Sequence, residues 1–409
     1  MTNLLWPGDQ RAGDLMTDQA LVQAMVAVES AWLSALAAAG LAPVECAAVD
    51  LGQLVGEQDC EMLALTSEAG GNPVIGLVAL LRDRADAVAA QWIHRGLTSQ
   101  DVLDTALMVA VRAVARFLLP LLAEQISTLC TLAATHRGTA MVARTLTQHA
   151  VPTTFGAKVA GWLNGVTHAY QQLSALATPA QIGGAAGTLA ATTELATLVA
   201  GSDDPVETAA RIVESVATVL GLDTGVPWHT TRTPITAAAD ALVVCTDAWG
   251  RIASDVVILV RPEIAELGES INTRGDESLT VPHKRNPVLS ILVRRAAIAA
   301  PQLAATLHTA AALANDERPD GAWHAEWDTL RTLARRTVVA GSQCSDLLAG
   351  LQVNSARMAE NLDAADIGDE QQAIAELAGK PPSPTYSGSI DRLIDASIDQ
   401  ARRQIEDRS

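Results

Sequence analysis

A polar stretch at residues 275–287 concentrates side chains that could do chemistry. It starts with a glycine, carries the hydroxyls of Ser278 and Thr280, and has no apolar periodicity with which to pack, which predicts a mobile loop. Lys284 and Arg285 follow these hydroxyls. A flexible hydroxyl beside two cations is suited to proton transfer on a substrate whose carboxylates the cations bind. The alternative interpretation is a solvated basic turn ahead of a helix.

The same stretch leads into a predicted helix. Asn286 fits an N-cap, Pro287 fits the first helical position, and residues 288–300 are mostly apolar. The unpaired backbone N–H groups of a helix start attract anions. His283, Arg285 and Asn286 are therefore candidate substrate-binding residues.

Two further predicted helix starts carry polar side chains, at residues 92–101 and 144–154. In the first, Thr98 or Ser99 would cap the helix and leave N–H groups free for an anion. Taken singly, such a start is more often an ordinary capped helix, but helix bundles build sites from facing helices. The candidates at these two starts are His94, Arg95, Thr98, Ser99, Gln100, Arg144, Thr145, Gln148 and His149.

Composition limits the classes of fold and function. Alanine and leucine are abundant, aromatic residues make up only 3%, and few segments alternate with period two, so we predict an all-α protein. A net charge of −18 argues against nucleic acid or an anionic membrane as partner. The sequence shows no leader, no uninterrupted apolar stretch of membrane length, and no clustered cysteines. We expect a cytoplasmic protein with reduced cysteines.

Long apolar helices are predicted in the centre of the chain, and their apolar faces extend over much of the circumference. This favours a bundle buried on several sides, including by other subunits. The predicted helices cover residues 100–135, 153–176, 233–262, 287–314 and 322–350, and a C-terminal one covers 388–406. The predicted domains are an N-terminal helical domain (1–95), a central bundle (96–350) and a short C-terminal helical domain (351–409).

The three polar regions resemble the conserved regions of the fumarase/aspartase superfamily. Residues 278–287 resemble its signature, GSSxMPxKxN, and the stretches around Thr98 and Arg144 resemble the other two regions. Four further segments resemble the 3-carboxy-cis,cis-muconate cycloisomerase family within it: residues 71–75, 181–189, 227–230 and 321–327.

The resemblance implies three helical domains and a homotetramer with a core of twenty helices, each active site taking residues from three subunits. It also implies proton transfer at the α-carbon of a carboxylate, through an aci-carboxylate intermediate, with no metal and no organic cofactor. The implied substrate is a small tricarboxylate. The implied reaction interconverts 3-carboxy-cis,cis-muconate and 4-carboxymuconolactone in protocatechuate degradation, the β-ketoadipate pathway.

Site roles follow from the resemblance in the same way. Ser278 would carry the proton, and Lys284 and Asn286 would bind the carboxylate at which the enolate develops. The helix start at residues 98–100 would bind a second carboxylate. Three further residues would position the substrate or supply acid: His94, Arg144 and His149.

Two departures from the superfamily pattern matter. Leu146 stands where most of these lyases have a histidine. A lactonising enzyme uses the substrate's own carboxylate, which needs no deprotonation near neutral pH, so Leu146 favours cycloisomerisation. Glu277 and Leu279 depart from the catalytic signature and leave Thr280 as an alternative proton carrier. The rival predictions are a fumarate-releasing lyase and a catalytically degraded structural homologue.

Overall fold

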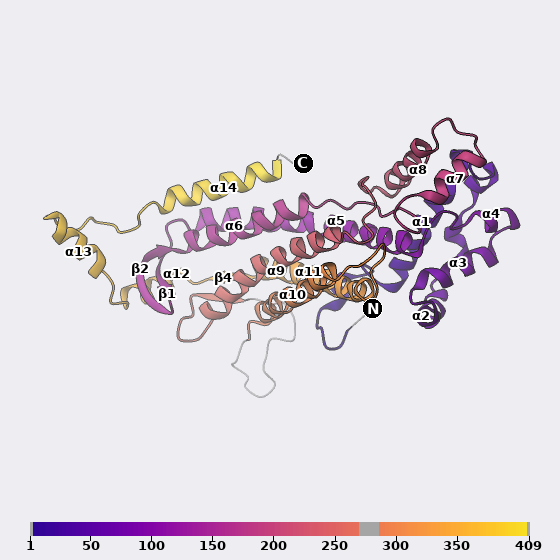
Figure 1. The fold of residues 1–409 in the computed structure, drawn as a ribbon. Helices are drawn as coiled ribbons and strands as arrows, with labels where there is room; N and C mark the ends of the chain where they lie inside the picture. The colour runs from indigo at the N-terminus through magenta and orange to yellow at the C-terminus, as the bar shows by residue number, and fades with distance from the viewer. Residues whose placement is uncertain (1–2, 270–285, 407–409) are drawn as a thin grey trace. The chain divides into compact units, whose positions relative to one another are not determined.

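A computed structural model describes residues 3–269 and 286–406 of the 409-residue chain, and they are mostly helical, as predicted (Figure 1). The fold consists of two compact units. Unit 1 consists of three segments: Met1–Arg116, Leu176–Asp240 and Gln302–Arg335. Unit 2 consists of the remaining three: Phe117–Ala175, Ala241–Pro301 and Arg336–Ser409. Four of the five boundaries between the units fall inside long helices. The predicted three-domain limits stay predictions.

Long central helices contribute residues to both units. They are α5 (Ser99–Thr135), α9 (Thr233–Leu259), α10 (Val288–Ala312) and α11 (Ala322–Ala349). Their ends lie within three residues of the predicted ones, so these predictions are confirmed. Pro120 lies inside α5 without ending it.

Unit 1 also contains shorter helices, several of which start at typical capping residues. They are η1 (Asp9–Ala12), α1 (Asp18–Ala38), η2 (Val44–Ala48), η3 (Leu51–Leu54), α2 (Asp59–Gly70), α3 (Pro73–Arg84), α4 (Ala87–Trp92), α7 (Ala190–Leu198) and α8 (Pro205–Leu220). Thr17 accepts a hydrogen bond from the backbone of Ala20 at the start of α1. Asn72 and Asp204 cap α3 and α8, each followed by a proline in the first helical position.

The core of unit 1 forms around α1. Trp32, Leu36 and Val28 are fully buried in one cluster with residues of α3, α5 and α8. Helix α1 packs against α8, and α7 packs against α8 in turn (Figure 1).

Unit 2 contains two small antiparallel sheets that the all-α prediction did not anticipate. Strands β1 (Ala140–Thr145) and β2 (Gln148–Thr154) form a hairpin, and β3 (Leu267–Glu269) pairs with β4 (Leu351–Val353). The segment predicted as a polar helix start at 144–154 is therefore mostly hairpin. Its polar and β-branched residues pair across the turn, and the helix begins only afterwards.

The helices confined to unit 2 are α6 (Phe155–Ser174), α12 (Ser355–Asp363), α13 (Asp369–Ala378) and α14 (Ile390–Glu406). Helix α14 runs alongside α6 (Figure 1). Arg137 forms ion pairs with Asp391 and Asp395 of α14. The predicted helices at 153–176 and 388–406 are confirmed.

Small residues allow close helix packing in unit 2. A Cβ on Gly341 of α11 would lie 2.8 Å from the Trp249 ring of α9, closer than real side chains approach. The Trp249 indole donates to Gln125 Oε1 at 2.7 Å, and Gln125 Nε2 donates to the Gly341 carbonyl at 3.0 Å. These contacts fix α5, α9 and α11 in one register within this unit.

Three helices, α1, α5 and α10, are long and apolar enough to span a membrane by length and composition. The sequence prediction concerned uninterrupted apolar stretches and is not contradicted, because polar residues such as Glu29, Arg112 and Arg294 interrupt these helices. In α10 only 33% of the most apolar window is buried within the chain. Ile291 and Ile298 of α10 are 50% and 71% exposed.

Candidate active site

The start of α5 in unit 1 is closed by its own residues. The Thr98 N–H donates to Asp101 Oδ2 at 3.0 Å, and the Thr98 carbonyl accepts from the backbone of Asp101 and Val102. Thr98 therefore caps the helix through its backbone, which leaves its hydroxyl available for other partners. Ser99, the other predicted cap, is the first residue of the helix and is half-buried.

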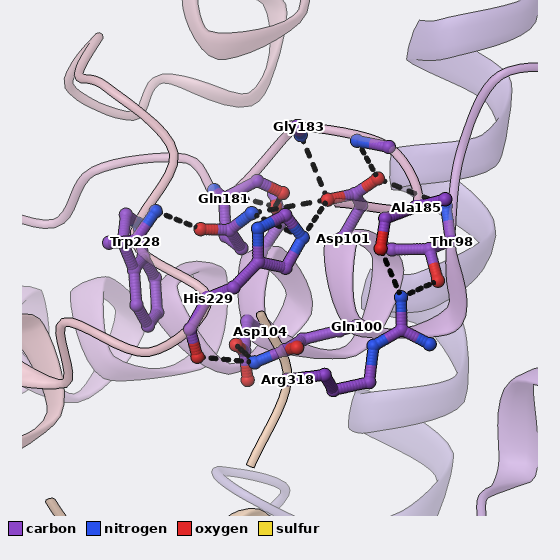
Figure 2. Close-up of polar contacts among 12 residues, drawn as sticks. Thr98, Gln100, Asp101, Asp104, Gln181, Gly183, Ala185, Trp228, His229 and Arg318 are labelled. Atoms are coloured by element: carbon purple, nitrogen blue, oxygen red, sulfur yellow. Dashed lines mark hydrogen bonds and ion pairs between the residues drawn. The ribbon is translucent and has the colours of Figure 1, made fainter. Parts of the chain in front are cut away.

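Asp101 is the centre of a buried polar cluster (Figure 2). Its carboxylate accepts hydrogen bonds from the N–H groups of Gly183 and Gly184, both at 2.9 Å, and lies 3.1 Å from Gln181 Nε2 and His229 Nε2. Gly183 is required there because a Cβ would lie 2.7 Å from His229 Cε1. The cluster fixes the loop at residues 181–184 against the start of α5.

A second buried cluster lies one turn further along α5. Arg232 donates to Asp104 Oδ2 at 2.7 Å and to Glu326 Oε2 at 2.5 Å, and all three side chains are at most 1% exposed. Burial alone would lower the pKa of Arg232, but the two carboxylates raise it overall. Burial raises the pKa of Glu326 despite its bonds to Arg232. Two buried carboxyl groups, of Asp104 and Glu326, thus share one buried cation, Arg232.

Gln100 joins the two clusters. Its amide nitrogen donates to Asp104 Oδ2 at 3.1 Å and to the His229 carbonyl at 2.8 Å, and the side chain is fully buried. The sequence predicts Gln100 as a substrate ligand. In the structure its amide nitrogen is instead bonded to Asp104 and to the His229 carbonyl.

Arg318, which no sequence motif indicates, lies at this helix start. Its Nη2 donates to the Thr98 hydroxyl and to the Ala185 carbonyl, the latter at 3.2 Å (Figure 2). The side chain is exposed, and no other hydrogen bond from its guanidinium is found among the described residues. Arg318 thus supplies a cation beside a predicted carboxylate-binding hydroxyl. Only tertiary structure reveals it, because the residue lies in the loop between α10 and α11.

His94 and Arg95 lie in the turn that leads into α5. His94 Nδ1 is 2.6 Å from Glu29 Oε1, and Arg95 is exposed and bonds through Nε to the Gln91 carbonyl at 2.6 Å. Both predicted residues therefore belong, with the start of α5, to unit 1.

The second predicted region forms the tip of the β1–β2 hairpin in unit 2. Arg144 is half-buried and donates to Glu266 at 3.0 and 2.7 Å. Thr145, Gln148 and His149 are exposed around the tip. Leu146, at the turn itself, is 96% exposed.

A lysine of α6 belongs to the same electrostatic environment. Lys158 Nζ lies 3.8 Å from Asp255 Oδ1, and burial lowers the pKa of Lys158, with Arg251 and Arg144 acting in the same direction. Asp255 accepts from the Trp162 indole at 2.7 Å. The sequence does not indicate Lys158 as a site residue, because it belongs to no recognisable motif.

At the start of α10, a protein carboxylate occupies N–H groups that were predicted to bind an anion. Glu269 of β3 accepts from Leu289 N at 2.6 Å, and from Ser290 N and Oγ at 3.2 and 2.8 Å. Asn286 is half-buried just ahead of the helix. The predicted site residues Ser278, His283, Lys284 and Arg285, and the variant positions Glu277, Leu279 and Thr280, lie outside the described residues.

The structure thus divides the predicted residues that it describes between the two units: His94 to Gln100 belong to unit 1, and the residues of the hairpin tip and Asn286 belong to unit 2. Within residues 3–269 and 286–406, no group of three or more His, Cys, Asp or Glu side chains is arranged to hold a metal ion. The chemistry that these groups offer is carboxylate binding by arginines, hydroxyls and imidazoles.

Comparison with known proteins places this geometry in a family. Residues 16–300 match the sequence profile of a family described as lyase. The chain is 44% identical to a nitrosuccinate lyase of Streptomyces davaonensis, over 85% of this chain and 74% of that protein. It is 39% identical to a 3-carboxy-cis,cis-muconate cycloisomerase of Bradyrhizobium diazoefficiens, over 85% and 76%.

A solved structure agrees with these relatives. The 3-carboxy-cis,cis-muconate lactonizing enzyme of Pseudomonas putida superposes with a TM-score of 0.82 at 27% identity, over 96% of this chain and 97% of that one. The match extends over nearly the whole length, including both units. The chain therefore belongs to the lyase family of the fumarase/aspartase superfamily, as its three motif regions predicted.

Proposed function

We propose that this enzyme is a cycloisomerase that interconverts 3-carboxy-cis,cis-muconate and 4-carboxymuconolactone. The observation that carries the proposal is the similarity to the lactonizing enzyme of Pseudomonas putida over 96% of this chain and 97% of that one. Leu146 argues in addition against lyases that release an amine or hydroxide, because it is an apolar and 96% exposed side chain at the hairpin tip, where most superfamily lyases have a histidine. A side chain without a titratable group neither protonates a leaving group nor activates water or an amine.

Opening or closing a lactone requires no titratable side chain at this position. In the opening direction, a base removes the proton at the α-carbon of a carboxylate, and the ring C–O bond breaks with its electron pair on the departing carboxylate. A carboxylate, with a pKa of about 4, leaves as an anion without protonation. In the closing direction the same carboxylate adds to the double bond and the proton returns to carbon.

The proposed roles divide between the units. Ser278 carries the proton, and Lys284 and Asn286 stabilise the developing enolate. The start of α5, with Thr98 and Ser99 beside Arg318, supports binding of a second carboxylate. His149 and Arg144 complete the proposed site from the hairpin.

A second candidate function is nitrosuccinate elimination, which the 44% identity to a nitrosuccinate lyase favours. In that reaction a base removes a proton next to a carboxylate and the C–N bond breaks, giving fumarate and nitrite. Nitrite is the anion of an acid and, like a carboxylate, departs without protonation. Leu146 is compatible with both reactions and argues against release of an amine or hydroxide.

We propose that the enzyme works as a homotetramer in the cytoplasm. The apolar and largely uncovered surface of α10, including Ile291 and Ile298, supports association through this helix. Assembly from several copies would also bring the residues of unit 1 and unit 2 from different subunits to one site.

The test uses purified protein and two substrates in parallel. The ultraviolet absorbance of 3-carboxy-cis,cis-muconate follows the first reaction, and nitrite and fumarate release follows the second. We expect wild-type turnover of the muconate to be lost in Ser278→Ala and Lys284→Ala. Muconate turnover equal to buffer would overturn the first proposal, and nitrite release would then establish the second. No turnover of either would indicate a degraded catalytic loop.

A further inference from the structure

A buried carboxylate contacts the histidine of the turn before α5. Glu29, on α1, is fully buried, and its Oε1 lies 2.6 Å from His94 Nδ1. The His94 side chain is 17% exposed. Its other nitrogen, Nε2, makes no hydrogen bond to any part of the chain that the structure describes. One ring nitrogen is thus fixed from inside the protein while the other is free.

Glu29 is an energetically unfavourable residue at this position unless it has a task. Its second oxygen, Oε2, is buried and has no hydrogen-bond partner among the described residues. A buried charged group with an unsatisfied oxygen lowers the free energy of unfolding of the protein. An apolar side chain of similar size would avoid this destabilisation.

The backbone of His94 is also unfavourable. Its φ is +64°, a left-handed conformation that residues other than glycine rarely adopt. Such strain persists where the surrounding structure holds it, and it concentrates at functional sites. The two costs therefore fall on two residues that contact each other: Glu29 is buried with an unsatisfied oxygen, and His94 has a strained backbone.

The turn around His94 is held from several directions. The Trp32 indole, one turn beyond Glu29 on α1, donates to the Arg95 carbonyl at 2.7 Å. Arg82 of α3 donates to the Ile93 carbonyl, also at 2.7 Å. Gly96 has φ +87°, and a Cβ there would lie 2.8 Å from Thr192 Oγ1. The carbonyls on both sides of His94 are therefore fixed, and only the imidazole remains to be oriented.

We propose that Glu29 is a positioning residue that accepts a hydrogen bond from the Nδ1–H of His94 and so presents Nε2 to the substrate. A carboxylate that fixes one nitrogen of an imidazole sets both its tautomer and its orientation. The turn leads directly into the helix start at Thr98, where the proposed function places a substrate carboxylate, so this inference rests on that function. Glu29 acts through His94 and does not itself touch substrate.

The kinetic test is a double-mutant cycle with the substrate that the wild type turns over. Glu29→Met removes the acceptor while filling the space, and we expect KM to rise about 10-fold, the scale of one charge-assisted hydrogen bond, with a smaller change in kcat. Glu29→Gln keeps an oxygen acceptor, so its KM should rise less than that of Glu29→Met. In a His94→Gln background, Glu29→Met should raise KM no further.

A matched control separates positioning from folding. Asp59 is also a buried carboxylate of unit 1, bonded to Arg84 at 2.7 and 2.8 Å, and it is no part of the proposed site. Asp59→Asn should lower the free energy of unfolding without raising KM. An equal rise in KM in Asp59→Asn, or in Glu29→Met on the His94→Gln background, would show that Glu29 is merely structural.

A second readout needs no substrate. Nitrogen-15 NMR of labelled histidines should show Nδ1 of His94 protonated in the wild type, and a fraction of the rings protonated only on Nε2 in Glu29→Met. A His94 ring protonated only on Nε2 in the wild type would overturn the inference. If the wild type turned over neither substrate, the proposed function would fail, but this spectrum would still decide whether Glu29 orients His94.

Discussion

Arg144 and Glu266 form a two-hydrogen-bond ion pair in unit 2, in which a predicted substrate ligand is already bound by a protein carboxylate. Glu266 is fully buried, and its Oε1 also accepts from Asn361 of α12 at 2.8 Å. The pair therefore fixes the hairpin to the C-terminal part of the chain. Since both terminal nitrogens of Arg144 contact Glu266, its position is set before any substrate arrives.

Breaking this pair should destabilise the protein. Glu266→Leu leaves the half-buried Arg144 without its counter-charge, and we expect the free energy of unfolding to fall by about 3–5 kcal/mol. Chemical unfolding at fixed protein concentration measures the change. The control is Glu360→Ala, which removes an exposed pair with Arg357 and should cost about 1 kcal/mol or less. Equal losses in the two variants would contradict a structural role for Glu266.

The hairpin turn is strained by its sequence. Leu146 and Thr147 have φ of +48° and +73°, the pattern of a two-residue turn that normally takes Asn-Gly. We expect the pair of substitutions Leu146→Asn and Thr147→Gly to raise the free energy of unfolding by about 1 kcal/mol. The control is Leu377→Asn, at a 90% exposed position inside α13, which should not raise the free energy of unfolding. A loss of stability in the turn variant would show that the side chains of Leu146 and Thr147 make contacts in the assembled protein.

This turn also shows where sequence reasoning stops. The long helices could be predicted because apolar residues cover much of their circumference and because starts such as Thr98 mark them locally. The hairpin could not, because its turn lacks the glycine and asparagine that signal one. The contacts that support the site could not be predicted for another reason. Asp101 contacts His229, and Thr98 contacts Arg318, and these pairs are far apart in the sequence.

Arg318 should contribute to substrate binding and little to stability. Its side chain is exposed and bonds to the Thr98 hydroxyl, so Arg318→Ala should raise KM about 10-fold while leaving the unfolding midpoint nearly unchanged. The KM of Arg318→Lys should lie between those of wild type and Arg318→Ala, because lysine keeps the positive charge but lacks the planar guanidinium group. Arg211→Ala, at an exposed arginine paired within α8, is the control and should leave KM unaltered. An unchanged KM in Arg318→Ala would remove Arg318 from the site.

Glu326 should make stability fall as pH rises. Burial raises its pKa above the ordinary value of 4.5, so between that value and the raised one the folded state holds a proton that the unfolded state has lost. Stability from this group is complete below pH 4.5 and is lost as pH rises through the folded pKa. Glu326→Gln cannot ionise, so its stability relative to wild type should increase from pH 4 towards neutrality, as measured by unfolding across that range. A difference that is constant with pH would contradict this account.

The uncovered face of α10 should be an assembly surface if the proposed tetramer forms. Ile298 is 71% exposed in the single chain, and a charge at a buried interface position is costly to desolvate. We therefore expect Ile298→Glu to sediment as a smaller species than wild type at equal concentration, while Ile298→Val, which keeps an apolar side chain, should not. Since the proposed site draws on several subunits, turnover should fall together with the assembled fraction and recover at higher protein concentration. An unchanged sedimentation coefficient in Ile298→Glu would place the interface on another face of the bundle.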